Sequence, residues 1–244
     1  MLTEGDRCTF RDDGFVVVED LIPEPLLNDI STHLAAVKNA ARDLEYSERN
    51  MNLESPDGGF LAQTGAVKCF KGVLRAVFHL ESRDEFFAEL GEKGPMYHDV
   101  VTQLLTRRKP ALLSVNFWAK SAVVGSPQPW HQDLAYLSSE QRREYAGALT
   151  AWIAVDEATE ENGCLEFYPG SHRLGDLPHL GSMDPDAGEQ IHLDVQRLFP
   201  ANPPTPVELR PGSAVFFDGL VVHGSKANRS PRAREAISFS YVYQ

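Results

Sequence analysis

One histidine and one aspartate lie close together near the middle of the chain. His131 and Asp133 are separated by one residue in the segment PQPWHQDLAYL. In an extended segment, residues i and i+2 point to the same face, so the imidazole and the carboxylate can converge on one point. Two imidazole nitrogens and one carboxylate oxygen form the facial triad that binds non-haem Fe(II) and leaves three coordination positions open. The pair supplies two of these three ligands and by itself is a weak signal.

A third ligand has to come from another strand. His223 ends the apolar run GLVVH, which follows the run SAVFF, and we expect these runs to form a strand pair that a barrel places across from His131. The alternative is a lone histidine at a strand end that bonds to a backbone carbonyl. Arg234 follows at the start of the last β-rich run, where a guanidinium could hold a dicarboxylic acid through two hydrogen bonds. Its alternative is a solvated surface arginine.

Other motifs predict no competing chemistry. The sequence contains no P-loop, dinucleotide-binding, nucleophile-elbow or HExxH signature. Ser171 and His172, which follow a Pro-Gly turn, are typical of a structural loop cap. The remaining histidines have no matching ligand partner, and we interpret them as surface or core residues: His33, His79, His98, His179 and His192.

The first 110 residues are predicted to be mostly helix and connection, with a short β-branched run over Gly14–Val18. Pro23–Leu44 has the three- and four-residue apolar spacing of an amphipathic helix. Glu45–Gly65 is polar and bears glycine and aspartate, which predicts a loop. Two further helical segments are expected over Asp84–Leu90 and Met96–Leu105.

From Ala111 onward the chain changes to short β-rich runs separated by turns, which predicts a sandwich or barrel. Asn162-Gly163 is a hairpin dipeptide, and Arg210-Pro211-Gly212 suits a type II turn. Helices first and strands later predict an α+β fold with a mainly β core. The segment over residues 172–205 is too polar and too rich in proline and glycine for the core, and we weigh a lid equally against a solvated loop. The predicted strands are ALLSVNFWAK, GALTAWIAV, CLEFY, PVEL, SAVFF, GLVVH and AISFSYVY.

Three blocks in the second half of the chain resemble the phytanoyl-CoA dioxygenase (PhyH) branch of the Fe(II)/2-oxoglutarate-dependent oxygenases. They are WHQD at residues 130–133, AWIAVDEATEENGCLEFYPGSH at residues 151–172 and HGSKANRSPRAREAIS at residues 223–238. The resemblance implies a double-stranded β-helix, that is a jelly-roll, cupin-like barrel with N-terminal buttressing helices. We expect one domain over residues 1–244, with 1–110 as helical support and 111–244 as the jelly-roll core.

The same resemblance implies a role for individual residues. His131, Asp133 and His223 match the iron ligands, and Arg234 matches the arginine that pairs with the distal carboxylate of 2-oxoglutarate. The resemblance also implies four further co-substrate contacts. Arg75 stands where the family often has a lysine, so the charge is kept while the geometry differs. The four contacts are Ser225, Arg75, Trp152 and Asn116. Trp152 matches a tryptophan in the wall of the co-substrate site, and Asn116 lies on the strand before the first ligand.

The implied activity is hydroxylation of a small-molecule metabolite by Fe(II), 2-oxoglutarate and O2, with release of succinate and CO2. Because Asp133 is present where related halogenases have a small residue, the resemblance favours hydroxylation over halogenation. Cyclisation, desaturation or epimerisation by the same iron chemistry remains an alternative. So does a metal-dependent cupin of another class, an isomerase or a hydrolase, and so does a noncatalytic binding protein that kept the barrel.

Composition excludes several other kinds of partner. The 244 residues carry 23 Lys and Arg against 35 Asp and Glu, a net charge of −12, which disfavours nucleic acid as a partner and gives no support for an acyl-CoA. The basic run Arg107–Lys109 is interpreted as cations that close a helix before Pro110. The oligomeric state is not predicted.

The sequence also predicts a cytoplasmic protein with no membrane segment. No uncharged apolar run approaches the roughly 18 residues that a spanning helix needs. The N-terminus carries acids where a signal peptide would be basic. The cysteines, Cys8, Cys69 and Cys164, are odd in number and widely spaced, which disfavours a disulfide framework.

Overall fold

The fold is seen in a computed structural model that describes residues 2–56, 65, 67–105, 108–181 and 190–244. Its first half alternates helices with short strands. The elements are α1 (Glu4–Asp13), β1 (Phe15–Val18), α2 (Glu24–Ala41), β2 (Met51–Leu53), β3 (Leu74–Val77), the 3-10 turn η1 (Leu80–Ser82), α4 (Glu85–Lys93), the π-helical turn η2 (Tyr97–Val101) and α5 (Thr102–Leu104).

The second half is mostly strand, with short helical turns between strands. Its elements are β4 (Pro110–Lys120), β5 (Gln128–His131), η3 (Asp133–Tyr136), α6 (Gln141–Glu144), β6 (Gly147–Ala154), β7 (Leu165–Phe167), η4 (Ser171–Leu174), α7 (Val195–Leu198), β8 (Thr205–Val207), β9 (Ala214–Asp218), β10 (His223–Ser225) and β11 (Arg234–Tyr243).

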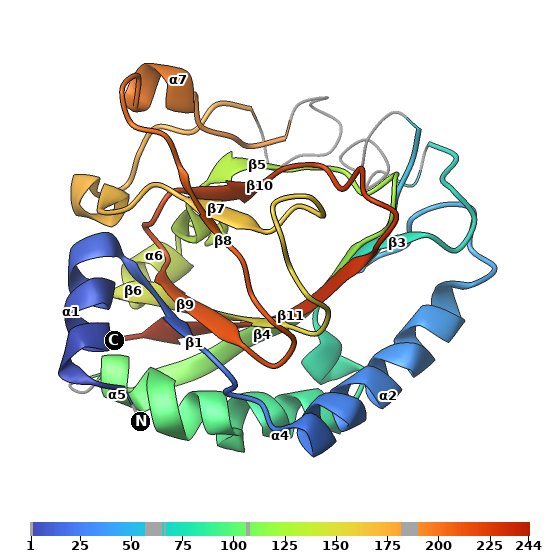
Figure 1. The fold of residues 1–244 in the computed structure, drawn as a ribbon, viewed down its shortest axis with the longest axis horizontal. Coiled ribbons are helices and arrows are strands. Elements are labelled where there is room, and N and C mark those ends of the chain that lie inside the picture. The colour runs from blue at the N-terminus through green and yellow to red at the C-terminus, as the bar shows by residue number, and fades with distance from the viewer. Residues whose placement is uncertain (1, 57–64, 66, 106–107, 182–189) are drawn as a thin grey trace.

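Within the described residues, the strands form two antiparallel sheets that face each other (Figure 1). The larger sheet has the order β1-β9-β6-β11-β4-β3-β2, and the smaller has the order β5-β10-β7-β8. Most neighbours in the two sheets are far apart in sequence, because the chain crosses from the large sheet to the small one after β4, β6 and β9 and returns after β5, β8 and β10. This arrangement confirms the predicted jelly-roll fold with a mainly β core.

Two hydrophobic cores lie on opposite faces of the large sheet. Ile153, Ile237 and Phe239 face the N-terminal helices, whereas Trp152 and Ala236, one residue away, face the small sheet. Neighbouring residues of a strand point to opposite faces, so a strand covered on both sides carries apolar residues nearly throughout. The predicted continuous β-rich runs are therefore the strands of the middle layer.

The helices α2 and α4 cover the outer face of the large sheet, as Figure 1 shows. Ile30 and Leu34 of α2 and Phe87 of α4 are fully buried against the sheet. Asp84 caps α4 by accepting a hydrogen bond from the Phe86 amide. The predicted helices of the N-terminal part are confirmed as a support for the barrel.

Two strands of the N-terminal part were not expected. The predicted loop over Glu45–Gly65 contains β2, and the chain around Arg75 forms β3; both extend the edge of the large sheet beyond β4. Each strand is three or four residues long and buried along its whole length. A run this short shows no alternation of apolar and polar residues, so its pattern does not reveal a strand.

The predicted strand GLVVH is wrong for all but its last residue. The segment Gly219–Val222 is a turn, in which the Val221 amide donates to the carbonyl of Asp218, and β10 begins at His223. β10 pairs with β5 and β7, and not with β9 as predicted. The apolar run is therefore the crossing from the large sheet to the small one, and it is buried because it passes between them.

The two predicted turns differ in outcome. Gly212 has a φ of +82°, as the type II turn requires. Asn162-Gly163 is not a hairpin, because β6 and β7 on either side of it belong to different sheets. Gly163 nevertheless has a φ of +82°, which favours glycine at this position.

Two predicted segments fall partly outside the described residues. The long segment 172–205 contains the end of η4, an isolated bridge between Leu180 and His192, and α7, while residues 182–189 are not described. Its role as a lid remains a prediction. In the basic run, residue 107 is not described, whereas Arg108 lies over the ring of Tyr243. Among the described helices, none is long and apolar enough to cross a lipid bilayer.

Candidate functional site

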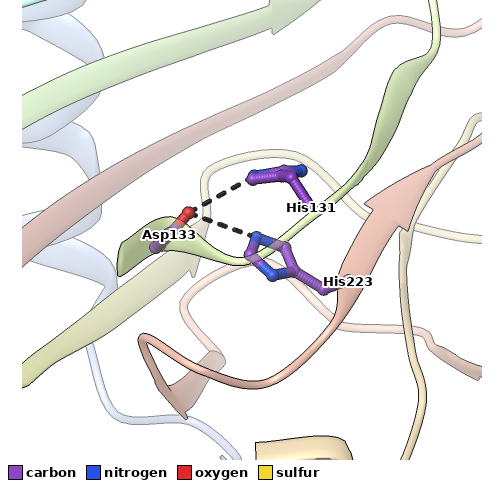
Figure 2. Close-up of side chains that lie close together, drawn as sticks. All are labelled: His131, Asp133 and His223. Carbon is purple, nitrogen blue, oxygen red and sulfur yellow. Dashed lines mark ion pairs between the residues drawn. The ribbon is translucent and has the colours of Figure 1, made fainter. Parts of the chain in front are cut away.

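The three predicted ligands come together between the two sheets (Figure 2). The Nε2 atoms of His131 and His223 lie 3.3 Å and 3.5 Å from Oδ1 of Asp133. One ligand atom from each residue lies within 4.8 Å of the others. Ligand atoms at right angles and about 2.1 Å from an ion are about 3 Å apart, so the cluster needs little adjustment to hold one metal ion on a single face.

The small sheet places the two histidines side by side. His131 is the last residue of β5, and its partner across the antiparallel pair is His223, the first residue of β10. Gln132 continues in an extended conformation with φ −112° and ψ 134°, and Asp133 then starts η3. The extended conformation of Gln132 brings Asp133 to the same face as His131, as the spacing predicts.

Hydrogen bonds fix the orientation of each ligand. Nδ1 of His131 lies 2.7 Å from the carbonyl oxygen of Pro129, and Nδ1 of His223 lies 3.1 Å from that of Val221. A carbonyl can only accept, so Nδ1 carries the proton and Nε2 keeps its lone pair for a metal. The Thr150 hydroxyl donates to Oδ2 of Asp133 over 2.6 Å, which leaves Oδ1 directed at the histidines.

The protonation states of the cluster suit metal binding. Burial would raise the pKa of Asp133, but His223, His131 and the bond from Thr150 outweigh it and lower this pKa to about 2. Burial and the neighbouring His131 lower the pKa of His223 to about 4. A carboxylate and a neutral imidazole are the forms that bind a metal. The sequence reasoning missed Thr150, whose role depends on strand register.

A buried cation lies on the same inner surface of the barrel. Arg234 begins β11, and its guanidinium lies 5.1 Å from the centre of the Trp152 ring and donates to the carbonyl of Gly163 over 3.2 Å. Burial lowers the pKa of Arg234 to about 10, so the group remains charged at neutral pH. Its Nε and Nη1 are buried and have no hydrogen-bond partner among the described residues. Unbonded buried donors of this kind fit a bound carboxylate.

Ser225 lies two residues after His223, so both side chains are on the same face of β10. Its hydroxyl accepts a hydrogen bond of 2.8 Å from Nζ of Lys120. Lys120 ends β4 directly opposite Arg234 and was not singled out in the sequence. The available signal was its position, because Asn116, Trp118 and Lys120 occupy every second place of one predicted strand and share its inner face.

The other two predicted contacts bond to protein groups. The side chain of Asn116 accepts a hydrogen bond from the amide of His79 and donates to Ser114. Arg75 donates to Gln128 Oε1 over 3.1 Å and to the carbonyl of Pro127. Their contact with a co-substrate remains a prediction.

The residues interpreted as structural have structural contacts. The Ser171 hydroxyl accepts a hydrogen bond from the Val222 amide, and Nε2 of His172 lies 3.1 Å from the carbonyl of Arg11. His33 pairs with Asp84, which joins α2 to α4. His179 lies next to two of the predicted ligands, because its Nε2 accepts a hydrogen bond from the amide of Gln132, the residue between His131 and Asp133.

The interior of this jelly roll carries a His-x-Asp pair, a distant histidine and a buried arginine with unbonded donors. This combination is typical of iron- and 2-oxoglutarate-dependent oxygenases. A sequence model of the phytanoyl-CoA dioxygenase (PhyH) family matches residues 10–236. The chain belongs to this family and is an Fe(II)/2-oxoglutarate-dependent oxygenase.

Curated relatives bear names from this family. A "Probable phytanoyl-CoA dioxygenase" of Caenorhabditis elegans is 33% identical over 155 residues, which cover 62% of this chain and 49% of that protein. The chain thus aligns with about half the length of that relative. A "Phytanoyl-CoA dioxygenase domain-containing protein 1 homolog" of Dictyostelium discoideum is 29% identical, and the alignment covers 99% of this chain and 91% of that protein.

Solved structures share the fold at lower identity. The carbocyclase SnoK from nogalamycin biosynthesis superposes with a TM-score of 0.72 at 20% identity, covering 99% of this chain and 84% of its own. EctD from S. alaskensis, with 2-oxoglutarate and 5-hydroxyectoine, superposes with a TM-score of 0.69 at 19% identity, covering 99% and 76%. At these identities the likeness shows the fold.

Proposed function

We propose that this oxygenase hydroxylates a small-molecule metabolite and that His131, Asp133 and His223 hold its iron. The observation that carries the proposal is the convergence of three oriented ligand atoms within 4.8 Å of one another on the inner surface of the barrel. The buried, unbonded donors of Arg234 lie on the same inner surface. When bound, the iron supplies the coupled oxidation in which 2-oxoglutarate, O2 and a C–H bond give succinate, CO2 and an alcohol.

The chain's own residues orient the co-substrate. Arg234 would hold the distal carboxylate through the free edge of its guanidinium, with Ser225 as a further hydrogen-bond partner. The Trp152 ring packs against Arg234 and keeps the guanidinium in place. A diacid held by Arg234 at one end would present its keto-acid end to the three metal ligands.

The set of ligands favours hydroxylation over halogenation, and leaves cyclisation, desaturation and epimerisation as alternatives. Asp133 occupies one metal position and is itself held by Thr150, so no position is left vacant for a halide in its place. A zinc or manganese isomerase or hydrolase could use the same three ligands. Such an enzyme would have no need for a buried arginine with unbonded donors, and neither would a noncatalytic barrel.

Turnover assays test the proposal. The purified protein with Fe(II), 2-oxoglutarate and O2 should release succinate and consume oxygen even without its own substrate, at a low uncoupled rate. Asp133→Ala removes the anionic ligand and should lower succinate release by about 100-fold or more, because carboxylate ligation anchors the metal. Succinate is quantified by mass spectrometry.

Asp29→Ala is the matched control, because Asp29 is an exposed carboxylate on α2. It should leave succinate release unchanged. Equal activity in Asp133→Ala and the wild type would show that the ligand assignment is wrong. Absence of succinate release with every metal tested, together with metal-dependent turnover of another kind, would favour the isomerase or hydrolase alternative.

A further inference from the structure

Lys120 is a buried cation that the predicted site does not include. It ends β4, its backbone pairs with Arg234 of β11, and directly paired residues of neighbouring strands have their side chains on the same face. Its side chain is turned toward β10, where Nζ donates to Ser225 Oγ over 2.8 Å and to the carbonyl of Lys226 over 2.5 Å. Lys120, Ser225 and Arg234 therefore gather at one end of the barrel.

The positive charge of Lys120 has no carboxylate partner. Both of these hydrogen bonds are to neutral oxygens, and neither Lys120 nor Arg234 has an ion pair within 4.0 Å among the described residues. Two buried carboxylates of this region have other partners: Glu54 bonds to the amide and the hydroxyl of Ser126, and Glu166 pairs with Lys226. Two buried cations beside each other without an anion are unfavourable unless a ligand brings the negative charge.

The third ammonium proton of Lys120 and the free edge of Arg234 remain available for such a ligand. Burial, together with Arg234 and Arg75, lowers the pKa of Lys120 well below its usual value, which is the effect expected of a cation held beside other cations without compensation. A bound anion would reverse this effect.

We propose that Lys120 is a second cation of the site for the distal carboxylate of 2-oxoglutarate, which it shares with Arg234 through Ser225. This inference rests on the proposed function. One carboxylate oxygen is held by Arg234 and the other by Lys120, so the pocket binds a keto acid with a distal carboxylate far better than one without it. Lys120 is then a co-substrate-binding residue in its own right.

The backbone of Gly163 leaves room for both cations. Its carbonyl accepts from Arg234, and a Cβ at this position would lie 2.9 Å from Cδ of Lys120 and 2.5 Å from the carbonyl oxygen of Lys226. The glycine therefore forms the wall against which the two side chains lie. Both its positive φ and this close packing favour glycine at the position.

A structural role for Lys120 is the competing interpretation. Its bonds to Ser225 and to the carbonyl of Lys226 join β4 of the large sheet to β10 of the small one. A purely structural lysine would affect stability and would affect all ligands alike. A residue that touches the distal carboxylate would affect only ligands that carry this group.

Binding to the Mn(II)-loaded protein under anaerobic conditions separates these roles. Isothermal titration compares 2-oxoglutarate with 2-oxopentanoate, which has a methyl group in place of the distal carboxylate. Lys120→Met should weaken 2-oxoglutarate binding roughly 10- to 100-fold, the effect of losing one charged hydrogen bond, and should leave 2-oxopentanoate binding unchanged. Lys226→Met is the matched control, because Lys226 is an exposed cation that pairs with Glu166.

Each outcome decides between the interpretations. Equal weakening of both ligands, or no weakening of 2-oxoglutarate in Lys120→Met, would overturn the inference while leaving the proposed function intact. A wild type that binds the two keto acids equally would overturn the proposed function as well. If Lys120→Met does not fold, Lys120→Arg serves instead: it keeps the charge, so it should retain the preference for 2-oxoglutarate, and a folded arginine variant that loses this preference would contradict the role of the charge.

Discussion

Arg75, Lys120 and Arg234 are buried at the inner surface of the barrel, where an uncompensated charge is costly. Natural cores rarely keep such groups without a partner. At the scale of single residues, the proposed carboxylate site accounts for Lys120 and Arg234, whereas Arg75 bonds to Gln128 and to the carbonyl of Pro127. The protonation of Lys120 should then control the affinity for the ligand.

The affinity for 2-oxoglutarate should depend on pH through Lys120. The groups that act on its pKa are Arg234 and Arg75, which lower it, and Glu54 and Cys164, which raise it; burial is the largest cause and the net direction is downward. Because the charged form binds the carboxylate, affinity should be highest below the lowered pKa of Lys120 and should fall as pH rises through it. Titrations of the Mn(II)-loaded protein at about pH 7 and about pH 9 measure this change.

Two controls accompany that measurement. Lys120→Met should show a smaller change, and 2-oxopentanoate, which chelates the metal in the same way, should report any pH effect on the metal itself. A wild-type affinity for 2-oxoglutarate that rises toward pH 9 would contradict the assignment.

Gln132, the residue between the first two ligands, should be a major determinant of stability. It is fully buried and donates to the carbonyls of Gly175 and Leu220, while its Oε1 accepts from the Leu177 amide. Gln132→Ala leaves these groups unsatisfied and should lower the free energy of unfolding by about 2–4 kcal/mol. Urea unfolding measures the loss.

Gln196→Ala, on the exposed side of α7, is the comparison and should change the unfolding free energy little. If both variants were equally stable, the three hydrogen bonds of Gln132 would contribute nothing measurable.

At the scale of elements, the sequence predicted what local spacing controls. The spacing of His131 and Asp133 predicted their convergence, and the apolar periodicity of Pro23–Leu44 predicted α2. Alternation with Asn116 could place Lys120 on the inner face, but its bond to Ser225 and the bond of Thr150 to Asp133 depend on which strands lie beside their own, so these roles could not be predicted. The apolar run before His223 was misleading because a buried crossing has the same composition as a strand.

Gly163 offers a test of how a loop element supports the anion site. Gly163→Ala should be destabilising by about 1 kcal/mol through its positive φ alone and should also weaken 2-oxoglutarate binding, because the new Cβ displaces the side chain of Lys120. Urea unfolding and isothermal titration measure the two effects.

Gly175→Ala is the matched control. Gly175 has a φ of +73° and nothing lies within 4 Å of an added Cβ, so only the backbone penalty applies. If Gly175→Ala weakened 2-oxoglutarate binding as much as Gly163→Ala, the contact with Lys120 would not be the cause.

At the scale of the whole molecule, the charge of the protein opposes that of its co-substrate. The net charge is −12, while the cations of the proposed site are buried. Long-range repulsion should therefore slow the approach of a dianion, and salt should relieve it. The association rate of 2-oxoglutarate should rise several-fold between about 10 mM and about 150 mM salt, as measured by stopped-flow.

The monoanion 2-oxopentanoate should show a smaller rise than 2-oxoglutarate under the same conditions. A rate that falls with added salt would mean that a local positive field at the mouth of the barrel dominates over the net charge. The expectation of a single domain over residues 1–244 remains a prediction.

The short strand β10 sets the distance between two parts of the proposed site. This strand has three residues, with His223 at one end and Ser225 at the other, and two residues of extended backbone span about 6.6 Å. In the proposed site, a metal ligand and a residue that contacts the distal carboxylate therefore lie at the two ends of one short strand, at a fixed separation. A keto diacid one carbon shorter or longer should fit this spacing less well, so the rise of a strand contributes to the co-substrate length that the proposed site prefers.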